Sequence, residues 1–176
     1  MGTPRDVIEV TLRAAPGLQY AFIMSTDPTR FRAPNIVERA FNRTFGFFVG
    51  LGFGPSYSYL LEVRGRKSGR LFPTPINLLE LNGKSFLVAP RGQTQWVKNA
   101  EAAAEITLKR GRTRLKFRLV PVPDAQKPEI LKAYLDQFAF AVQKFFPIPA
   151  GSPVDAFKAI AANYPVFELV PSEYAP

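Results

Sequence analysis

Apolar residues change their spacing along the chain, and the change separates helical from strand-forming segments. After Pro34 they recur every three or four positions, which predicts a helix with one buried stripe made of Val37, Phe41, Phe45 and Phe48. The glycine-rich run 50–55 ends that helix. Beyond it, short runs rich in Leu, Val, Ile and Tyr replace the helical spacing, so we expect the centre of the chain to form a sheet.

The sheet-forming region predicts six strands, at residues 57–64, 74–81, 84–89, 106–109, 113–120 and 165–170. Asn82-Gly83 is a strong hairpin signal between the second and third strands, and Gly111 joins the fourth to the fifth. In the fifth strand cationic residues alternate with apolar ones, in the order Arg114, Leu115, Lys116, Phe117, Arg118 and Leu119. This alternation predicts one face in the core and one solvated, cationic face.

A long helix is expected after the fifth strand, beginning between Asp124 and Pro128. Its apolar row at i, i+4 spacing consists of Ile130, Tyr134, Phe138, Val142 and Phe146. A short helix follows Pro153. The fold class is therefore α+β, mainly β, with about six mostly antiparallel strands and flanking helices.

The length of 176 residues and the apolar content of 47% are those of one ordinary domain. We interpret residues 34–176 as that domain and residues 1–33 as an N-terminal arm. Charged residues interrupt the first twenty positions, so they do not resemble a secretory signal. Because the chain also has no cysteine, which suits a reducing compartment, we expect a cytoplasmic protein.

The absence of both histidine and cysteine narrows the chemistry of any active site. It removes the usual imidazole base, the thiolate nucleophile and the commonest metal ligands, so we expect no metal site. A catalyst built from this chain must use Asp, Glu, Lys, Tyr or a cofactor.

The formal net charge of +9 is concentrated in two clusters, Arg64, Arg66, Lys67 and Arg70, and Lys109, Arg110, Arg112, Arg114, Lys116 and Arg118. A basic surface attracts polyanions. Nucleic acid, anionic lipid and an acidic cofactor tail all qualify, and charge alone does not choose among them. On the fifth strand the aromatic residue alternates inward, which is the wrong side for stacking on bases, so nucleic acid is not favoured as a partner.

Gly65-Arg66-Lys67-Ser68-Gly69 has the composition of an anion-binding loop. The glycines let backbone amides turn toward an anion, Arg66 offers a planar fork, Lys67 a compact charge and Ser68 a hydroxyl. The alternative interpretation is a solvated hairpin turn with ordinary surface cations.

A second candidate segment runs from residue 89 to residue 99, where a loop containing Pro and Gly leads from a strand into a short helix. The first-turn amides of that helix are placed to face an anion or a ring carbonyl, and Trp96 to cover a planar ligand. The alternative is that Trp96 packs into the core and Asn99 caps a helix.

The two segments together resemble the deazaflavin-dependent nitroreductase family, also called the deazaflavin/quinone reductase family. The resemblance rests on the order of the 65–69 loop, Pro75, the strand end at Leu87-Val88-Ala89, Trp96 and Asn99. It covers about residues 54–122, with a weaker echo at 165–169.

The resemblance implies a split β-barrel that binds the deazaflavin coenzyme F-420, whose tail bears a phosphodiester and a string of glutamates. The residues that inherit cofactor binding are Arg66, Lys67, Ser68 and Gly69 for the tail, Pro75 along its path, Ala89, Pro90, Arg91, Gly92 and Gln93 near the ring, and Trp96 and Asn99 at the cleft. FMN is the alternative cofactor.

The activity implied is hydride transfer from the reduced cofactor to an electron-poor small molecule, such as a quinone, a nitroaromatic compound or an enone. Tyr134 is the candidate proton donor, although a row of aromatic residues at i, i+4 spacing also suits a core. The alternative function is a non-catalytic split barrel that holds a flavin or a lipid, in peripheral contact with a membrane through the aromatic N-terminal arm. The sequence leaves a homodimer open.

Overall fold

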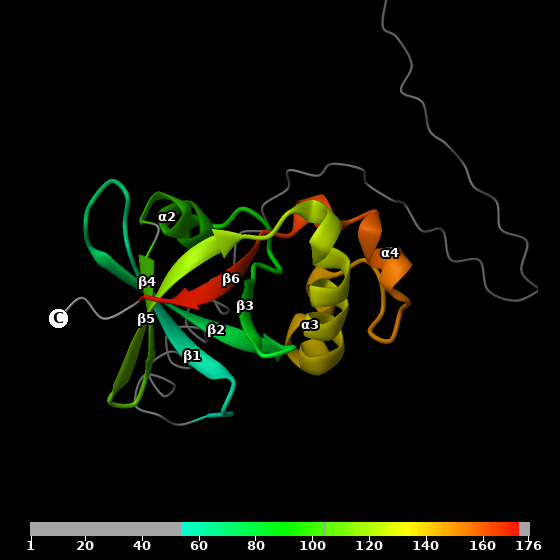
Figure 1. Ribbon diagram of the computed structural model, residues 1–176, viewed down its shortest axis with the longest axis horizontal. Helices are drawn as coiled ribbons and strands as arrows, with labels where there is room; N and C mark the ends of the chain where they lie inside the picture. The colour runs from blue at the N-terminus through cyan, green and yellow to red at the C-terminus, as the bar shows by residue number, and fades with distance from the viewer. Residues whose placement is uncertain (1–53, 104, 173–176) are drawn as a thin grey trace, which may run out of the picture.

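The computed structural model describes residues 54–103 and 105–172, and the structural statements below concern these residues. The expected N-terminal arm and the helix expected after Pro34 lie outside them. Six antiparallel strands close into a barrel in the order β1-β2-β3-β6-β5-β4 (Figure 1). The strands are β1 (Ser58–Arg64), β2 (Leu71–Leu81), β3 (Lys84–Val88), β4 (Glu105–Arg110), β5 (Thr113–Pro121) and β6 (Val166–Pro171).

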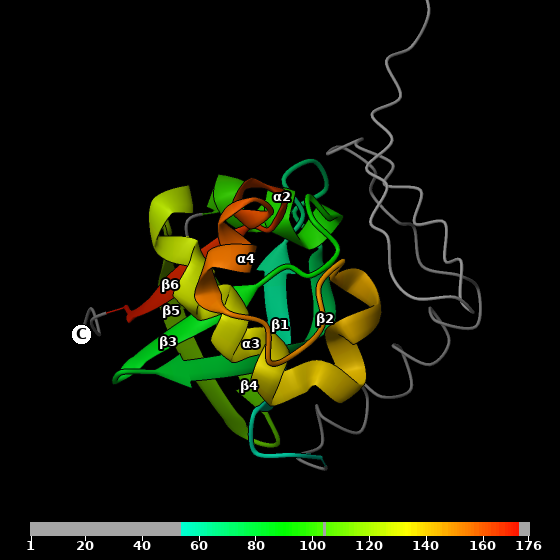
Figure 2. The same cartoon turned by 90° about the vertical axis from the view of Figure 1, so that its right-hand side faces the viewer.

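Three helices flank the barrel, which confirms the expected α+β fold with about six antiparallel strands. They are α2 (Gln95–Ala103), α3 (Lys127–Val142) and α4 (Val154–Lys158). Figures 1 and 2 show α3 and α4 together on one side of the barrel, while α2 lies apart from them over another part of it. None of the helices described here is long and apolar enough to cross a membrane.

The two hairpin turns form where the sequence predicts them. Asn82 and Gly83 have φ values of 52° and 75° between β2 and β3, and Gly111 has a φ of 57° between β4 and β5. Positive φ at both central positions suits a type I′ turn at Asn82-Gly83, and positive φ at Gly111 alone suits a turn with glycine at the first central position; both types match the twist of the strands.

The first half of β2 has only one strand beside it, although the barrel itself is closed. Residues 71–77 pair with β1, whereas only residues 78–81 pair with β3. Pro73 and Pro75 lie in the singly paired half, where a missing N–H is tolerated because one edge of the strand is free. Helix α2 packs against β1 and β4 and buries Val97 and Ala100 completely.

The apolar row expected for the long helix is buried, and α3 packs with it against β2 and β3. Ile130, Tyr134, Phe138 and Val142 lie in α3 and are each at most 6% exposed. Phe146 is also buried, but it lies beyond the end of α3 in extended backbone, so its expected place in the helical row is wrong. Each large apolar side chain buried in this way stabilises the fold by roughly 1.5–3 kcal/mol.

The apolar residues that alternate with cations along β5 are only partly buried. Phe117 and Leu119 are half-buried and pack on the barrel core, but Leu115 is 44% exposed. Leu115 lies close to the β4–β5 turn, where the end of the barrel meets solvent. The expectation of a core position is therefore wrong for Leu115.

Candidate functional site

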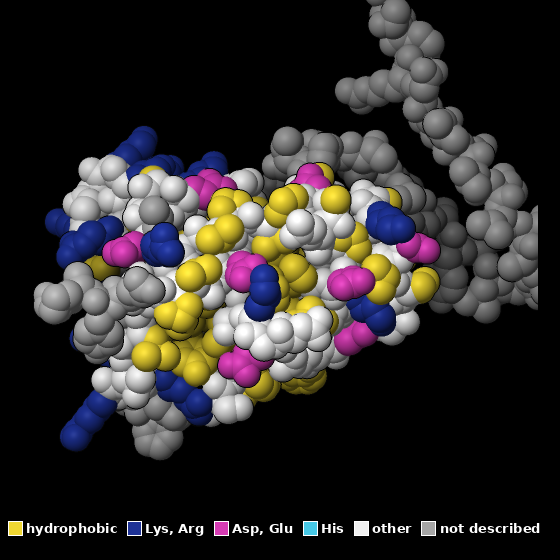
Figure 3. Space-filling view, viewed as in Figure 1, with side chains coloured by type: hydrophobic (Ala, Val, Ile, Leu, Met, Phe, Trp, Pro, Cys, Tyr) yellow, Lys and Arg dark blue, Asp and Glu magenta, His cyan; other side chains and the backbone are white. Residues whose placement is uncertain are grey.

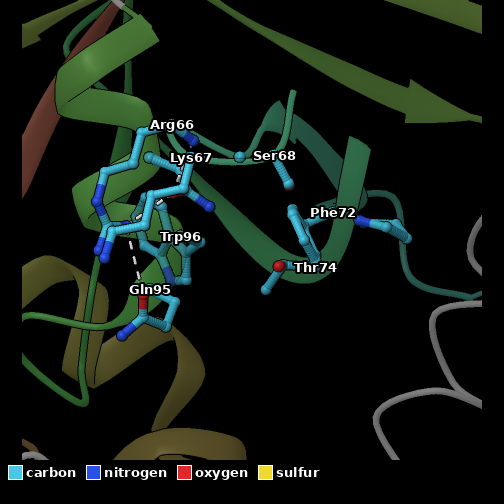
Figure 4. Close-up of a pocket in the computed structure, with 10 residues that line it drawn as sticks. Arg66, Lys67, Ser68, Phe72, Thr74, Gln95 and Trp96 are labelled. Carbon is cyan, nitrogen blue, oxygen red and sulfur yellow. Dashed lines mark hydrogen bonds between the residues drawn. The ribbon is translucent and has the colours of Figure 1, made fainter. Parts of the chain in front are cut away.

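A cavity of about 570 Å³ lies between the β1–β2 loop, the free half of β2 and helix α2 (Figure 4). Arg66, Gln95 and Trp96 stand on one side of it, Phe72 and Thr74 on the other, and the loop with Lys67 and Ser68 joins the two sides. The full lining is Gly65, Arg66, Lys67, Ser68, Phe72, Pro73, Thr74, Gln95, Trp96 and Asn99.

The β1–β2 loop is a closed turn whose glycines both have a structural reason. The Gly69 N–H donates to the Gly65 carbonyl at 2.7 Å, and Gly69 adopts a φ of +66° that favours glycine. A Cβ at position 65 would lie 2.5 Å from Cε2 of Phe72, so the close approach of that ring requires glycine. The turn leaves the N–H groups of Lys67 and Ser68 without an acceptor among the described residues.

Arg66 is held against helix α2 by two amide side chains. Its backbone N–H and its Nη1 both donate to Oδ1 of Asn99, at 3.3 Å and 2.8 Å. Nη1 also donates to Oε1 of Gln95 at 3.3 Å (Figure 4). Since one guanidinium nitrogen makes all the side-chain contacts, the other donors of the fork are left for a ligand.

The contacts of Arg66 also decide which way the two amides point. The side-chain carbonyl oxygens of Asn99 and Gln95 face the donors of Arg66. Their NH2 groups are therefore the groups that Arg66 does not use, and these can donate hydrogen bonds. Ser68 Oγ accepts the Arg70 N–H at 3.4 Å, which leaves its O–H to donate. With Lys67 added, the polar lining offers hydrogen-bond donors and positive charge.

No lining residue of the cavity carries a carboxylate, a phenol or a thiol. A concave surface that combines cations, free amide donors and no acid is complementary to an anion. Two aromatic residues complete it. Trp96 is half-buried and also packs on Phe167 at 6.2 Å, and Phe72 is 46% exposed.

The structure thus brings together the expected residues Arg66, Lys67, Ser68, Trp96 and Asn99. Gly69 closes the turn beside them without lining the cavity. The alternative role of Asn99 as a helix cap is wrong, because the residue lies in the middle of α2. Trp96 partly fulfils both interpretations, since it lines the cavity and touches the core.

The loop between β3 and α2 does not line this cavity. Ala89 is fully buried and its N–H donates to Pro165, while the Gly92 N–H donates to the Ala89 carbonyl. The Arg91 guanidinium lies 4.6 Å from the centre of the Phe145 ring. The assignment of the ring contact to Ala89, Pro90, Arg91, Gly92 and Gln93 stays a prediction.

Pro75 does not line the cavity either, although Phe72, Pro73 and Thr74 of the same strand do. It pairs with Leu60 across β1 and β2. The role of Pro75 along the path of the cofactor stays a prediction. The sequence did not point to Phe72 and Pro73, because the strand was expected to begin at residue 74.

Tyr134 is not a proton donor to this cavity. It is 3% exposed in the cluster between α3 and the barrel, with its ring 5.0 Å from that of Phe138. Burial raises the pKa of its phenol well above the usual range. A phenol enclosed in the core and hard to ionise serves packing, so the catalytic assignment is withdrawn.

Thr94 precedes helix α2 and Gln95 begins it, and neither was singled out in the sequence. Gln95 contributes through Arg66, as described above. The hydroxyl of Thr94 is buried and has no hydrogen-bond partner among the described residues. An unpaired buried hydroxyl is costly and therefore unusual.

Comparison with solved structures finds several similar folds. An F420-H2 dependent reductase is 19% identical, with 65% of this chain and 95% of that chain covered and a TM-score of 0.44. A protein of unknown function from Agrobacterium tumefaciens is 18% identical, with 79% and 59% covered and a TM-score of 0.48. The heme storage protein HutZ from Vibrio cholerae is 10% identical, with 67% and 83% covered and a TM-score of 0.45. None of these values is high enough to assign an activity.

Comparison with sequences gives a clearer result. No curated protein matches the chain. The family model described as F420H(2)-dependent quinone reductase matches residues 36–143, which is more than half of the chain and includes the whole lining of the cavity. This agrees with the family that the ordered motifs resemble, and the protein therefore belongs to the F420H(2)-dependent quinone reductase family.

Proposed function

We propose that the cavity holds the anionic tail of coenzyme F-420, and that the protein directs a hydride from the reduced cofactor to an electron-poor acceptor. The acceptor class is a quinone, a nitroaromatic compound or an enone. The observation that carries the proposal is the polar lining of the cavity, which presents cations and donors and no carboxylate. The family match adds F420H(2) as the reductant.

The residues present suit the cofactor that the family implies. Its tail carries phosphodiester and carboxylate groups, and both are bound well by a planar guanidinium and by turned backbone amides. Arg66 supplies the first, and the unpaired N–H groups of Lys67 and Ser68 supply the second. The volume of about 570 Å³ lies within the range of small-molecule sites.

The protein's own residues bind and orient in this proposal, and they do not exchange protons. Bound F-420 supplies the hydride. Arg66 and Lys67 neutralise the tail, and Trp96 and Phe72 offer aromatic surfaces that exclude water from one wall. The lining of this tail-binding cavity holds no carboxylate, phenol or thiol, so we assign no proton donor for the acceptor to it.

FMN serves as the comparator cofactor. It also has a phosphate group, but the family match names F420H(2) and nothing in it supports FMN. Binding of the two cofactors to the same protein separates them directly, and quenching of Trp96 reports occupancy because it is the only tryptophan.

The test removes the two cations of the loop together. We expect Arg66→Ala/Lys67→Ala to weaken F-420 binding by about a hundredfold, as the loss of charge-assisted hydrogen bonds implies. The matched control is Arg112→Ala/Lys116→Ala, which removes the same charge from exposed positions of the β4–β5 hairpin outside the cavity. Equal losses in both variants, or none in the first, would reject the site.

Catalysis is tested separately from binding. With reduced F-420 bound, oxidation of the cofactor should depend on an added quinone, nitroaromatic compound or enone. If wild-type protein binds F-420 but oxidises it with none of these acceptors, the non-catalytic alternative is correct.

A further inference from the structure

Two lining residues on α2, Gln95 and Asn99, also hold one of the cavity's cations, Arg66, in place. Asn99 lies in the middle of α2 and is 6% exposed. Its side-chain carbonyl accepts hydrogen bonds from both the backbone N–H and Nη1 of Arg66. One buried acceptor therefore fixes the main chain and the side chain of the same cation, and it joins the β1–β2 loop to the helix that carries Trp96.

We propose that Asn99 is a positioning residue which, through Arg66, makes the site selective for a deazaflavin with an anionic tail over the same chromophore without the tail. The proposal rests on the proposed function, which assigns the tail to this cavity. In this proposal Arg66 is the main ligand of the anionic tail, and Asn99 sets the selectivity by holding Arg66.

The physical basis is that the arginine is ordered before the ligand arrives. A free arginine side chain loses much rotamer freedom when a ligand fixes it, and that loss weakens binding. Here Asn99 and the exposed Gln95 hold Nη1 in the protein itself, at 2.8 Å and 3.3 Å. The remaining donors of the fork are thus presented to the cavity in one orientation.

The neutrality of Asn99 matters as much as its geometry. An aspartate at this position would accept the same two hydrogen bonds. Its negative charge would, however, partly neutralise the guanidinium and repel the anionic tail. A neutral acceptor leaves the full charge of Arg66 for the ligand.

The experiment is a double-mutant cycle on Asn99→Leu and Arg66→Ala, with affinity measured by Trp96 quenching for F-420 and for the tail-less chromophore. We expect Asn99→Leu to weaken F-420 binding about tenfold, the effect of one charge-assisted hydrogen bond. It should leave the tail-less chromophore unchanged. In the Arg66→Ala background it should have no further effect, because the residue acts through Arg66.

Asn99→Asp keeps the test valid if the leucine variant fails to fold. The carboxylate retains both accepted hydrogen bonds, so the thermal unfolding midpoint should stay close to that of the wild type. Affinity for F-420 should still fall, while affinity for the tail-less chromophore should not.

Additive losses in the cycle, or equal losses for both ligands, would overturn the proposal and leave Asn99 as a residue that only holds α2 in place. Wild-type affinity for F-420 in both Asn99 variants would overturn it as well. A wild-type protein that does not prefer F-420 over the tail-less chromophore would instead refute the proposed function.

Discussion

Gly65 shows how one position controls the shape of the cavity. Its hydrogen atoms leave room for the Phe72 ring, since a Cβ would lie 2.5 Å from Cε2 of Phe72 and 2.9 Å from Oγ of Ser68. Phe72 is 46% exposed, so its ring has solvent into which it can move. A methyl group at position 65 should therefore displace the ring from the cavity wall more than it disturbs the fold.

We expect Gly65→Ala to lower the free energy of unfolding by about 1 kcal/mol, the low end of the range for overpacking. F-420 affinity should fall with it. In a Phe72→Ala background the same change should cost less stability and less affinity, because only the close contact with Oγ of Ser68 remains. Chemical denaturation and F-420 titration of the four proteins measure this. A cost that is undiminished without Phe72 would show that the ring is not the reason for glycine at this position.

Thr94 offers a second prediction at the residue scale. Because its buried hydroxyl has no partner among the described residues, Thr94→Val should raise the free energy of unfolding by about 1 kcal/mol. Thr94→Ser is the control, since it keeps the hydroxyl and should not stabilise. Chemical denaturation of the cofactor-free proteins measures these free energies of unfolding. A valine variant less stable than wild type would mean that the Thr94 hydroxyl has a hydrogen-bond partner in solution.

At the scale of elements, the sequence predicts the architecture well because its signals are local. Asn82-Gly83 specifies its hairpin through positive φ values, and the i, i+4 row of α3 is buried as expected. The start of β2 was predicted three residues late, at the position after Pro73, because a proline argues against a strand unless one edge is free. That free edge depends on where β3 stops pairing, which no local pattern shows.

Asp136 ties α3 to the turn before α4, and its contribution depends on pH. Its carboxylate accepts hydrogen bonds from Lys132 Nζ and from the Gly151 N–H, both at 2.7 Å. These partners, Lys132 first, lower the pKa of Asp136 below 3.8. A carboxyl group whose pKa is lowered by folding stabilises the protein above its unfolded pKa, and this contribution is lost as pH falls through the folded value.

We therefore expect Asp136→Asn to be less stable than wild type at pH 7, by at most about 1 kcal/mol since solvent screens the pair. The difference should shrink as pH falls below about 4. Thermal unfolding at pH 7 and pH 3 measures both values. Glu129→Gln, at an exposed position of the same helix, is the control and should show no such change. A difference that grows on acidification would contradict the assignment.

At the scale of the molecule, most of the described Lys and Arg residues belong to the barrel and its loops. Figure 3 shows Lys and Arg side chains gathered around the barrel, while Asp and Glu side chains occur both there and over the part that carries α3 and α4. The basic β1–β2 loop belongs to the barrel half, next to α2. Long-range attraction thus adds to the local donors in drawing an anion toward the cavity.

Residues of the site that are adjacent in the sequence were easier to predict than contacts between residues far apart in the sequence. Arg66, Lys67 and Ser68 are adjacent in the chain, so composition revealed them. The link between Arg66 and Asn99 joins two elements, and the sequence suggested only that both belong to the cleft. Tyr134 illustrates the opposite error, since it was proposed as a proton donor although its spacing already suited a core, and its burial supports the core role.

The central claim is that the donor-lined cavity recognises the tail of F-420. The most direct measurement is the affinity of the wild-type protein for F-420 and for the chromophore without its tail, in parallel Trp96 quenching titrations. The account predicts that F-420 binds at least about tenfold more tightly, as expected for charge-assisted contacts to Arg66 and Lys67. Equal affinity for the two ligands would contradict it.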